Sequence, residues 1–339
     1  MKIKLLEVLI ISIAATLLLS GCGRVREQRE SNQATQTAQD AGSPPAASTD
    51  APATSAGAPT GGGCGVASKT GSSVQSIESS GVTRSYRLHV PKGYDPSQPT
   101  PLVLNFHGFG SNALEQERYA EYPEAADKYG FIVATPDGTN APRRWYIYGE
   151  REQGYVDDFA FTEALIDYLS ATLCVDASRV YATGISNGGG MTSLLGCKLN
   201  DRIAAIAPVA GSPYADAQCR GKGPMPVIAF HGTDDQFVPF EGGPGGRLGL
   251  PSGAVRDNMR DWAKHNGCNM TVQTQRIAAD VVLESYGGCK DGADVQLYVV
   301  EGGGHTWPGG RIEIPGLGET THSISATELS WAFFAAHPK

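Results

Sequence analysis

The chain alternates short apolar runs with longer segments in which apolar and polar residues mix. Each run is continuous and is bounded by glycine, proline or turn residues, which is typical of strands buried on both faces of a sheet. One earlier segment, "RSYRLHV" at Arg84–Val90, instead alternates apolar and polar residues and predicts an antiparallel edge strand. The continuous runs predict buried strands at 101–108, 131–136, 179–186, 204–211, 226–232 and 295–305.

Helical periodicity lies between these runs. In "VDDFAFTEALIDYLSATL", Phe161, Leu165 and Leu169 recur on one helix face, and Asp157 or Asp158 precedes them as an N-cap. Further helices are expected at about 112–129, from the end of the 179–186 strand to about 199, and from about 252. Strands that alternate with helices in this way predict an α/β fold with a mostly parallel central sheet and helices on both faces.

The N-terminal segment resembles a bacterial lipoprotein signal. Lys2 and Lys4 precede an apolar stretch, Val8 to Leu19, that is too short to span a bilayer comfortably. The stretch runs into Ser20-Gly21-Cys22, which is similar to the lipobox, where signal peptidase cuts before a cysteine that carries diacylglycerol. We expect a signal peptide at 1–21 and an exported protein anchored to the outer or cell membrane surface by a lipid on Cys22. The alternative is a plain secretory signal in which Cys22 is incidental.

Composition separates a tether from a folded domain. Residues 22–63 are rich in Ala, Ser, Thr, Pro and Gly and lack apolar periodicity, which predicts a disordered tether. Residues 64–339 are expected to form a single domain. The net charge of −8 argues against nucleic acid and anionic membrane as partners, since phosphate groups bind basic surfaces. Membrane contact is expected only through the lipid.

Six cysteines remain beyond Cys22. In an exported chain they are expected to form disulfides, and Cys268 and Cys289, which flank a short polar segment, are the best single pair. The other four, Cys64, Cys174, Cys197 and Cys219, allow three connectivities. A metal site is not expected, because the chain has no CxxC motif and no His-Cys cluster.

Ser186 stands in "GISNG", which fits G-x-S-x-G. Glycines two positions before and after the serine allow a tight strand-to-helix turn that exposes the hydroxyl. The pentapeptide alone is modest evidence, because glycine-rich turns match it by chance. Two later strand ends add weight: "HGTDDQFVP" carries Asp234 and Asp235, and "EGGGHTWPGG" carries His305.

These residues predict a catalytic triad. The order Ser, Asp, His along the chain is that of α/β-hydrolases, in which the histidine is the general base and the aspartate orients it. The loop "HGFG" after the 101–108 strand would supply one oxyanion-hole amide, at Phe109, and Asn187 the other.

Other residues near these strand ends have structural interpretations. His107 and His231 are expected to shape their turns, Asp234 to cap a turn, and Asp157 and Asp158 to cap a helix. The tryptophans in neighbouring loops, Trp145 and Trp307, are candidates for substrate binding, with packing in the core as an equal alternative.

Six motifs together carry a resemblance to a known family: "HGFG", "VDDFAF", "GISNGGGM", "AAIAPVAG", "HGTDDQFVPF" and "GGGHTWPGG". They resemble the secreted esterases that include poly(3-hydroxybutyrate) depolymerase-like lipoproteins and feruloyl or acetylxylan esterases. The resemblance covers residue 84 to the C-terminus and implies an α/β-hydrolase fold, Ser186 as nucleophile, Asp235 rather than Asp234 as acid, His305 as base, and no cofactor.

The resemblance implies a carboxylic ester hydrolase of the poly(3-hydroxybutyrate) depolymerase type. Alternatives are a feruloyl or acetylxylan esterase acting on plant polysaccharide, an acyltransferase or peptidase, and a surface protein that binds without turnover. The glycine-rich segment Glu241–Gly253, which carries Arg247, follows the acid-bearing loop. It is expected to be either a spacer or a rim that contacts substrate beyond the ester.

Overall fold

The computed structural model describes residues 62–147, 156–211, 219–243, 246–247 and 252–339. The expected signal peptide at 1–21, the lipid site at Cys22 and all but the last two residues of the expected tether at 22–63 lie outside the described residues. Within the described part, no helix combines the length and apolar character needed to cross a bilayer.

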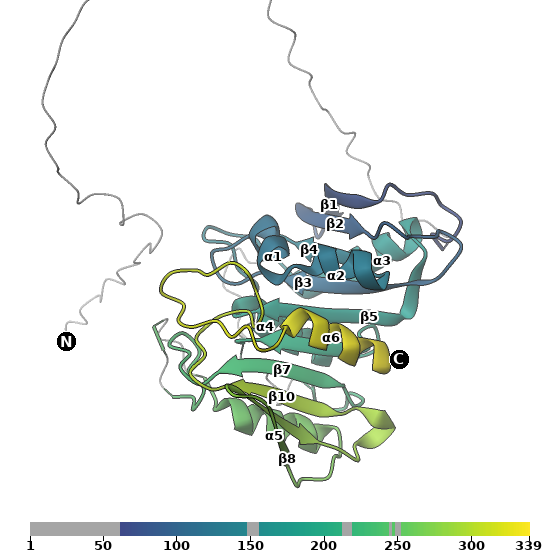
Figure 1. Cartoon of the computed structure of the whole chain (residues 1–339). Coiled ribbons are helices and arrows are strands. Elements are labelled where there is room, and N and C mark those ends of the chain that lie inside the picture. Colours follow the sequence, from purple (N-terminus) through teal and green to yellow (C-terminus); the bar gives the residue numbers. More distant parts are fainter. Residues whose placement is uncertain (1–61, 148–155, 212–218, 244–245, 248–251) are drawn as a thin grey trace, which may run out of the picture. The chain divides into compact units, whose positions relative to one another are not determined.

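One ten-stranded sheet organises the described residues, in the order β1-β2-β4-β3-β5-β6-β7-β10-β9-β8 (Figure 1). The central pairs from β4 to β10 are parallel, and the two strands at each end of the sheet are added in antiparallel fashion. The strands are β1 (Gly71–Ser79), β2 (Val82–Val90), β3 (Thr100–Phe106), β4 (Ile132–Pro136), β5 (Val175–Ile185), β6 (Ala205–Val209), β7 (Val227–Gly232), β8 (Gln273–Ala278), β9 (Val281–Tyr286) and β10 (Val295–Val300).

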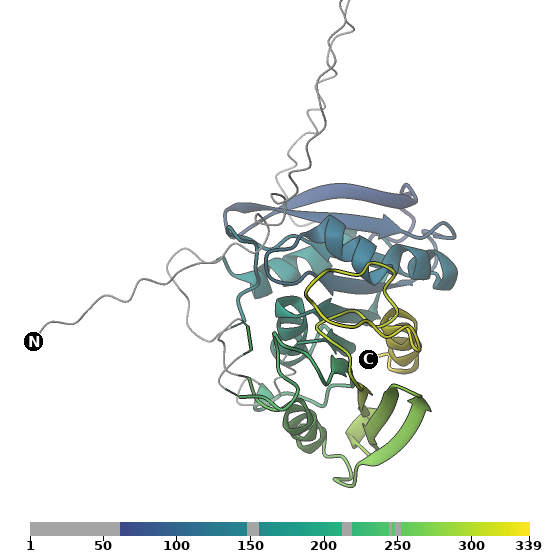
Figure 2. The same ribbon diagram turned by 60° about the vertical axis from the view of Figure 1, so that its left-hand side comes forward.

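Helices cover both faces of the sheet (Figures 1 and 2). The helices are α1 (Ala113–Ala120), α2 (Tyr122–Tyr129), α3 (Asp158–Thr172), α4 (Asn187–Lys198), α5 (Val255–His265) and α6 (Ala326–Ala336). Residues of α3, α4 and α5 share one buried cluster, and residues of α1, α2 and α6 share the other. Strand β3 contributes side chains to both clusters: Leu102 and Leu104 belong to the first, and Val103 belongs to the second. This is because successive side chains of a strand point to opposite faces of the sheet.

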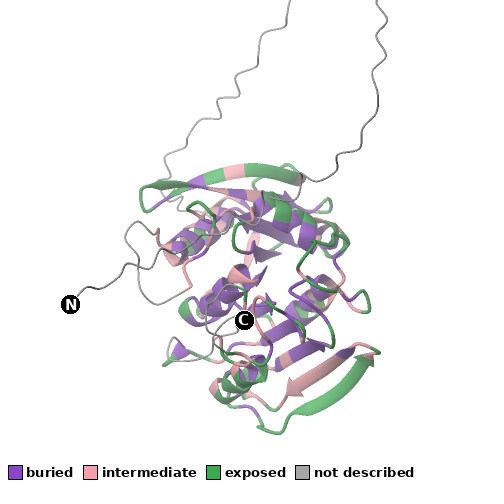
Figure 3. Cartoon of the chain, turned by 90° about the vertical axis from the view of Figure 1, so that its left-hand side faces the viewer, coloured by how far each residue is buried: buried purple, intermediate pink, exposed green. Residues whose placement is uncertain are grey.

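How far a strand is buried depends on its position in the sheet. The central strands β3 and β6 are buried along their length, whereas the end strand β8 is almost wholly exposed (Figure 3). The central strands were predicted from their continuous apolar runs, and the structure confirms each of them. The polar hairpin of β8 and β9 lacks such a run, which explains why the pattern did not predict it.

Three features of the helices and strands differ from what the sequence predicted. The helix expected at 112–129 is divided at Glu121, whose φ of 54° is incompatible with a continuing helix. Strand β2 is antiparallel as predicted, but it is not at the edge because β1 pairs with it. Helix α5 begins at Val255, three residues beyond the expected start.

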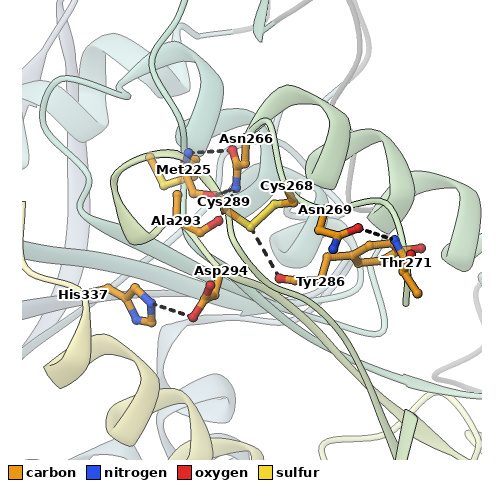
Figure 4. The surroundings of a disulfide bond; sticks show 10 residues. All are labelled: Met225, Asn266, Cys268, Asn269, Thr271, Tyr286, Cys289, Ala293, Asp294 and His337. Carbon is orange, nitrogen blue, oxygen red and sulfur yellow. Dashed lines mark hydrogen bonds and ion pairs between the residues drawn. A yellow bond between two sulfur atoms is a disulfide. The ribbon is translucent and has the colours of Figure 1, made fainter. Parts of the chain in front are cut away.

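The three disulfides are Cys64–Cys174, Cys197–Cys219 and Cys268–Cys289. The last confirms the predicted pair, and the first two resolve the connectivity that the sequence left open. Beside Cys268, the buried Asn266 side chain accepts from the Met225 amide at 2.9 Å and donates to the Ala293 carbonyl at 2.8 Å (Figure 4). The disulfide and this amide together join the end of α5 to the segment before β10.

Candidate active site

The parallel strands end at one edge of the sheet, and the predicted reactive residues all follow strands there. Ser186 follows β5, Asp235 follows β7 and His305 follows β10. Strand β6 separates β5 from β7, and β10 lies beside β7. Ligands of open α/β sheets bind beyond these carboxyl ends.

Ser186 lies in a strained turn between β5 and α4. Its φ of 59° and ψ of −120° lie outside the regions that non-glycine residues ordinarily adopt. The Ser186 amide donates to the Val209 carbonyl at 2.9 Å and its carbonyl accepts from the Gly190 amide at 2.9 Å, so both sides of the turn are held. Backbone strain that the surroundings hold in this way is found at functional sites.

The flanking glycines are required by close approach. A Cβ on Gly188 would lie 2.2 Å from the Phe106 carbonyl oxygen, and one on Gly184 would lie 2.5 Å from the same atom. Any side chain at these positions would push β3 away from the turn. The G-x-S-x-G pattern therefore reflects packing against β3 as well as the turn itself.

Asp235 and His305 form a buried pair. The His305 Nδ1 lies 2.7 Å from Asp235 Oδ2, and both side chains are almost inaccessible to solvent. The other carboxylate oxygen accepts hydrogen bonds from the backbone amides of Phe237 at 2.8 Å and Val238 at 2.9 Å. Asp234 differs, because it is exposed and its Oδ1 accepts only from the adjacent Thr233 hydroxyl at 3.2 Å within the described residues.

Electrostatics keep Asp235 ionised. Burial raises the pKa of a carboxyl group, but hydrogen bonds from His231 and His305 outweigh burial and hold the pKa of Asp235 well below its ordinary value. An ionised carboxylate at Nδ1 fixes the imidazole tautomer with its free nitrogen at Nε2. In the described part of the chain no hydrogen bond joins His305 to the Ser186 hydroxyl, a contact that such sites often tighten only with substrate bound.

His231 is a second histidine beside the same carboxylate. Its Nε2 lies 2.8 Å from the Val238 carbonyl oxygen and 3.3 Å from Asp235 Oδ2, so its N–H is shared between the two. The sequence predicted a structural role in the turn, and this geometry agrees with it. The sequence did not indicate the contact with Asp235, because the contact depends on how the loop between these two residues folds.

The "HGFG" loop passes directly over the serine. A Cβ on Gly108 would lie 3.4 Å from the Ser186 Cβ. The Phe109 amide, next in this loop, donates no hydrogen bond within the described residues. The Asn187 amide is the first of α4, and the first amides of a helix have no acceptor within the helix. In this part of the chain, the Phe109 and Asn187 amides are therefore candidates for an oxyanion site beside Ser186.

A hydrogen-bond network links Asn187 to the loop that carries Phe109. The Asn187 side chain accepts from the Trp145 amide at 2.7 Å and donates to the Trp145 carbonyl at 3.2 Å. The Trp145 indole donates to the His107 carbonyl at 2.9 Å. The His107 Nε2 accepts from the Gly138 amide at 2.9 Å, and burial lowers the pKa of His107 so that it stays neutral. His107 therefore shapes its loop, as predicted.

The two tryptophans are buried in this structure. Each is 1% exposed. Trp145 packs edge-on against Phe106, and the Trp307 indole donates to the Thr327 hydroxyl at 3.0 Å. These contacts are those of packing in the core, and a role of either tryptophan in substrate binding stays a prediction.

The segment Glu241–Gly253 is described only in part. Gly243 and Ser252 pair in a short antiparallel bridge, so the two ends of the segment meet. Arg247 lies against the acid-bearing loop, where its amide donates to the Gln236 carbonyl at 2.7 Å. Its guanidinium lies 5.6 Å from the centre of the Phe237 ring, and that ring lies 5.1 Å from the His305 ring. Phe237 is a neighbour of the site that the sequence did not indicate.

Comparisons with known proteins place this arrangement among esterases. The family described as Esterase PHB depolymerase matches residues 84–236. Feruloyl esterase B of Piromyces equi is 33% identical over 231 residues, which are 66% of this chain and 42% of that protein. A putative esterase, NocK, of Nocardia uniformis subsp. tsuyamanensis is 32% identical over 276 residues, 75% of this chain and 79% of that protein.

A solved structure shares the fold. The acetyl xylan esterase from Aspergillus awamori superposes with a TM-score of 0.57, covers 78% of this chain and 99% of its own, and is 15% identical. This likeness concerns the fold alone, and it confirms the fold class expected from the sequence. The chain spans less than half the length of the Piromyces relative. More than half of that protein therefore lies outside the match.

Proposed function

Because the chain belongs to the Esterase PHB depolymerase family of α/β-hydrolases, we propose that it hydrolyses carboxylic esters through an acyl-enzyme on Ser186. The observation that carries the proposal is the buried His305–Asp235 pair at 2.7 Å, at the same sheet edge as the strained Ser186 turn. An imidazole held by an ionised carboxylate, near a serine exposed on a turn, is the arrangement that makes a hydroxyl nucleophilic.

The chemistry follows from the atoms. The His305 Nε2 takes the proton from Ser186 Oγ as the oxygen attacks the ester carbonyl carbon. The negative charge moves to the carbonyl oxygen, which the Phe109 and Asn187 amides bind. His305 then gives the proton to the leaving alcohol, and the acyl group remains on Ser186. Water, deprotonated by the same imidazole, releases the acid and restores the serine.

The Ser186→Ala variant tests this mechanism. Turnover of p-nitrophenyl acetate should fall by about 10⁴-fold or more, because only the oxyanion site and substrate binding remain. Circular dichroism and the melting temperature check that the fold is intact. Comparable turnover by a Ser186→Ala preparation made in an esterase-free host would reject the acyl-enzyme.

Two substrate classes follow from the relatives. The family description names poly(3-hydroxybutyrate) depolymerase, and the Piromyces relative is a feruloyl esterase. We propose hydroxyalkanoate oligoesters as the first class and feruloyl or acetyl esters on polysaccharide as the second. Hydrolysis of hydroxybutyrate oligomers, methyl ferulate and acetylated xylan by residues 64–339 would rank them.

The protein is proposed to work outside the cytoplasm. Three disulfides suit an oxidising compartment, and the lipobox-like sequence supports a lipid on Cys22. Labelled palmitate should enter the full chain expressed in bacteria and should not enter the Cys22→Ala variant. Labelling that survives the substitution, or its complete absence from both, would reject the anchor.

A further inference from the structure

Arg247 is an exposed cation beside the proposed base. Its Nη1 donates to the Gly316 carbonyl at 3.3 Å. The neighbouring Leu317 carbonyl accepts from the His305 amide at 2.6 Å. Arg247 therefore touches both segments that flank His305: the loop after Asp235 and the 314–317 turn. These contacts hold the guanidinium at the site without neutralising its charge.

A second arginine, Arg256, has a similar aromatic neighbour, but a carboxylate neutralises its charge. Arg256 also lies over a phenylalanine, with its guanidinium 4.9 Å from the centre of the Phe240 ring, but it forms an ion pair with Glu284 at 2.9 Å. Arg247 forms no ion pair within the described residues, and the sequence from Gly242 to Gly253 contains no acidic residue. Within the described residues, the positive charge of Arg247 is therefore left for a ligand to pair.

The position of Arg247 indicates which part of a substrate it meets. In the proposed mechanism His305 protonates the leaving alcohol, so groups beyond His305 face the alcohol portion of the ester. The Phe237 ring neighbours both groups, with its centre 5.1 Å from that of the imidazole ring and 5.6 Å from the guanidinium. Two exposed apolar side chains stand in the neighbouring loops: Phe109 is 46% exposed and Ile314 is 42% exposed.

We propose, on the basis of the proposed function, that Arg247 binds a carboxylate carried by the alcohol portion of the substrate. A guanidinium with free N–H groups is the side chain best suited to a carboxylate. A chain with a net charge of −8 otherwise repels anions, so a local cation at the site selects for them. Two substrate chemistries carry such a group: the acid end of a hydroxyacid oligoester, and a uronate in an acylated polysaccharide.

Matched pairs of esters test the proposal. One pair is 3-acetoxybutanoate and 3-acetoxybutanamide, and the other is an acetylated methyl galacturonoside and its primary amide. In each pair only the charge of the alcohol portion differs. For the wild-type protein, kcat/KM should favour the acid in at least one pair, and the pair that responds identifies the source of the carboxylate.

The Arg247→Gln variant should reduce that acid-to-amide ratio by about 3- to 10-fold, mainly through KM, as expected for a partly exposed charge-assisted contact. Added salt should reduce the wild-type ratio in the same direction. The matched control is Arg256→Gln, which removes an arginine of the same packing type whose charge is already paired, and it should keep the ratio.

The outcomes separate this proposal from the proposed mechanism. Equal acid-to-amide ratios in the wild type and Arg247→Gln would overturn the carboxylate site, as would hydrolysis of p-nitrophenyl acetate with no turnover of either acid. A parallel loss of acid and amide turnover in Arg247→Gln would show a structural role and also overturn it. Failure of the mechanism would appear separately, as p-nitrophenyl acetate turnover that survives Ser186→Ala.

Discussion

Two buried aspartates, Asp235 and Asp158, show how different surroundings give one residue type different roles. Asp158 lies at the first turn of α3, where it pairs with Arg84 at 2.8 Å and accepts from the Tyr146 amide at 2.8 Å. Both side chains of that pair are essentially inaccessible to solvent. Asp235 instead accepts from two backbone amides and from the imidazoles of His305 and His231.

The pKa values of the two carboxyl groups are also shifted in opposite directions. Burial raises the pKa of Asp158, and the attraction of Arg84 does not fully offset it. For Asp235, hydrogen bonds from His231 and His305 outweigh burial, and the pKa is lowered. A buried arginine partner therefore marks a structural anchor here, whereas a ring of N–H donors that includes histidine marks the candidate acid of a triad. The sequence assigned Asp158 to a helix cap and Asp235 to the triad, but it indicated neither the Arg84 partner nor the His231 contact.

The largest contrast is expected from the same substitution at both sites. Asp235→Asn should lower kcat/KM for p-nitrophenyl acetate by about 10⁴-fold, since an amide stabilises the wrong imidazole tautomer. Asp158→Asn should retain most activity, because Asp158 does not contact His305 and the amide oxygen can still accept from either Arg84 or the Tyr146 amide. Steady-state kinetics on both purified variants check this, and similar losses at the two sites would remove the contrast.

Asp158 should affect stability through its hydrogen bonds more than through its charge. Asp158→Ala leaves the buried Arg84 guanidinium without its carboxylate and should cost about 3 kcal/mol of unfolding free energy. Asp158→Asn should cost less than Asp158→Ala, because the amide oxygen keeps one acceptor for the buried donors. Urea unfolding of the two variants gives the comparison, and an equal cost for both would show that the charge dominates.

The pH dependence of stability should have opposite signs at the two sites. The lowered pKa of Asp235 gives a stabilising contribution that is complete above its ordinary value of 3.8 and is lost as the pH falls through the folded-state pKa. The raised pKa of Asp158 gives a contribution present below 3.8 that is lost as the pH rises through its folded-state pKa.

These signs can be measured from unfolding free energies across acidic pH. Asp235→Asn should flatten the loss of stability at the acidic end, and Asp158→Asn should remove the loss on raising the pH above 3.8. Curves for both variants that run parallel to the wild type would contradict the assignments.

The smallest effect is expected at the neighbour of the candidate acid. Asp234 is exposed and does not contact His305. Asp234→Asn should therefore change kcat/KM by less than about 2-fold, as surface substitutions usually do. The same kinetic assay serves, with Asp235→Asn as the reference. If Asp234→Asn lost as much activity as Asp235→Asn, the assignment of Asp235 as the acid would be wrong.

Local pattern predicted the parts of the molecule that depend on neighbouring residues. The central strands follow from continuous apolar runs, and the Ser186 turn follows from its flanking glycines, which steric contact with Phe106 requires. The order of Ser186, Asp235 and His305 along the chain, each after a strand, was enough to indicate that all three lie at one sheet edge. The hairpin of β8 and β9 was not predicted, because exposed strands carry little apolar signal.

The tertiary structure decided what depends on residues far apart in the sequence. It selected one disulfide connectivity among three, placed Trp145 and Trp307 in the core, and set His231 beside Asp235. It also brought Arg247 to the Phe237 ring while leaving its charge unpaired within the described residues. Burial, pKa and ion pairing arise from contacts across strands and loops, so periodicity along the chain cannot determine them. The sequence by itself determined the order of the chemical groups, and only folding determined which of them meet.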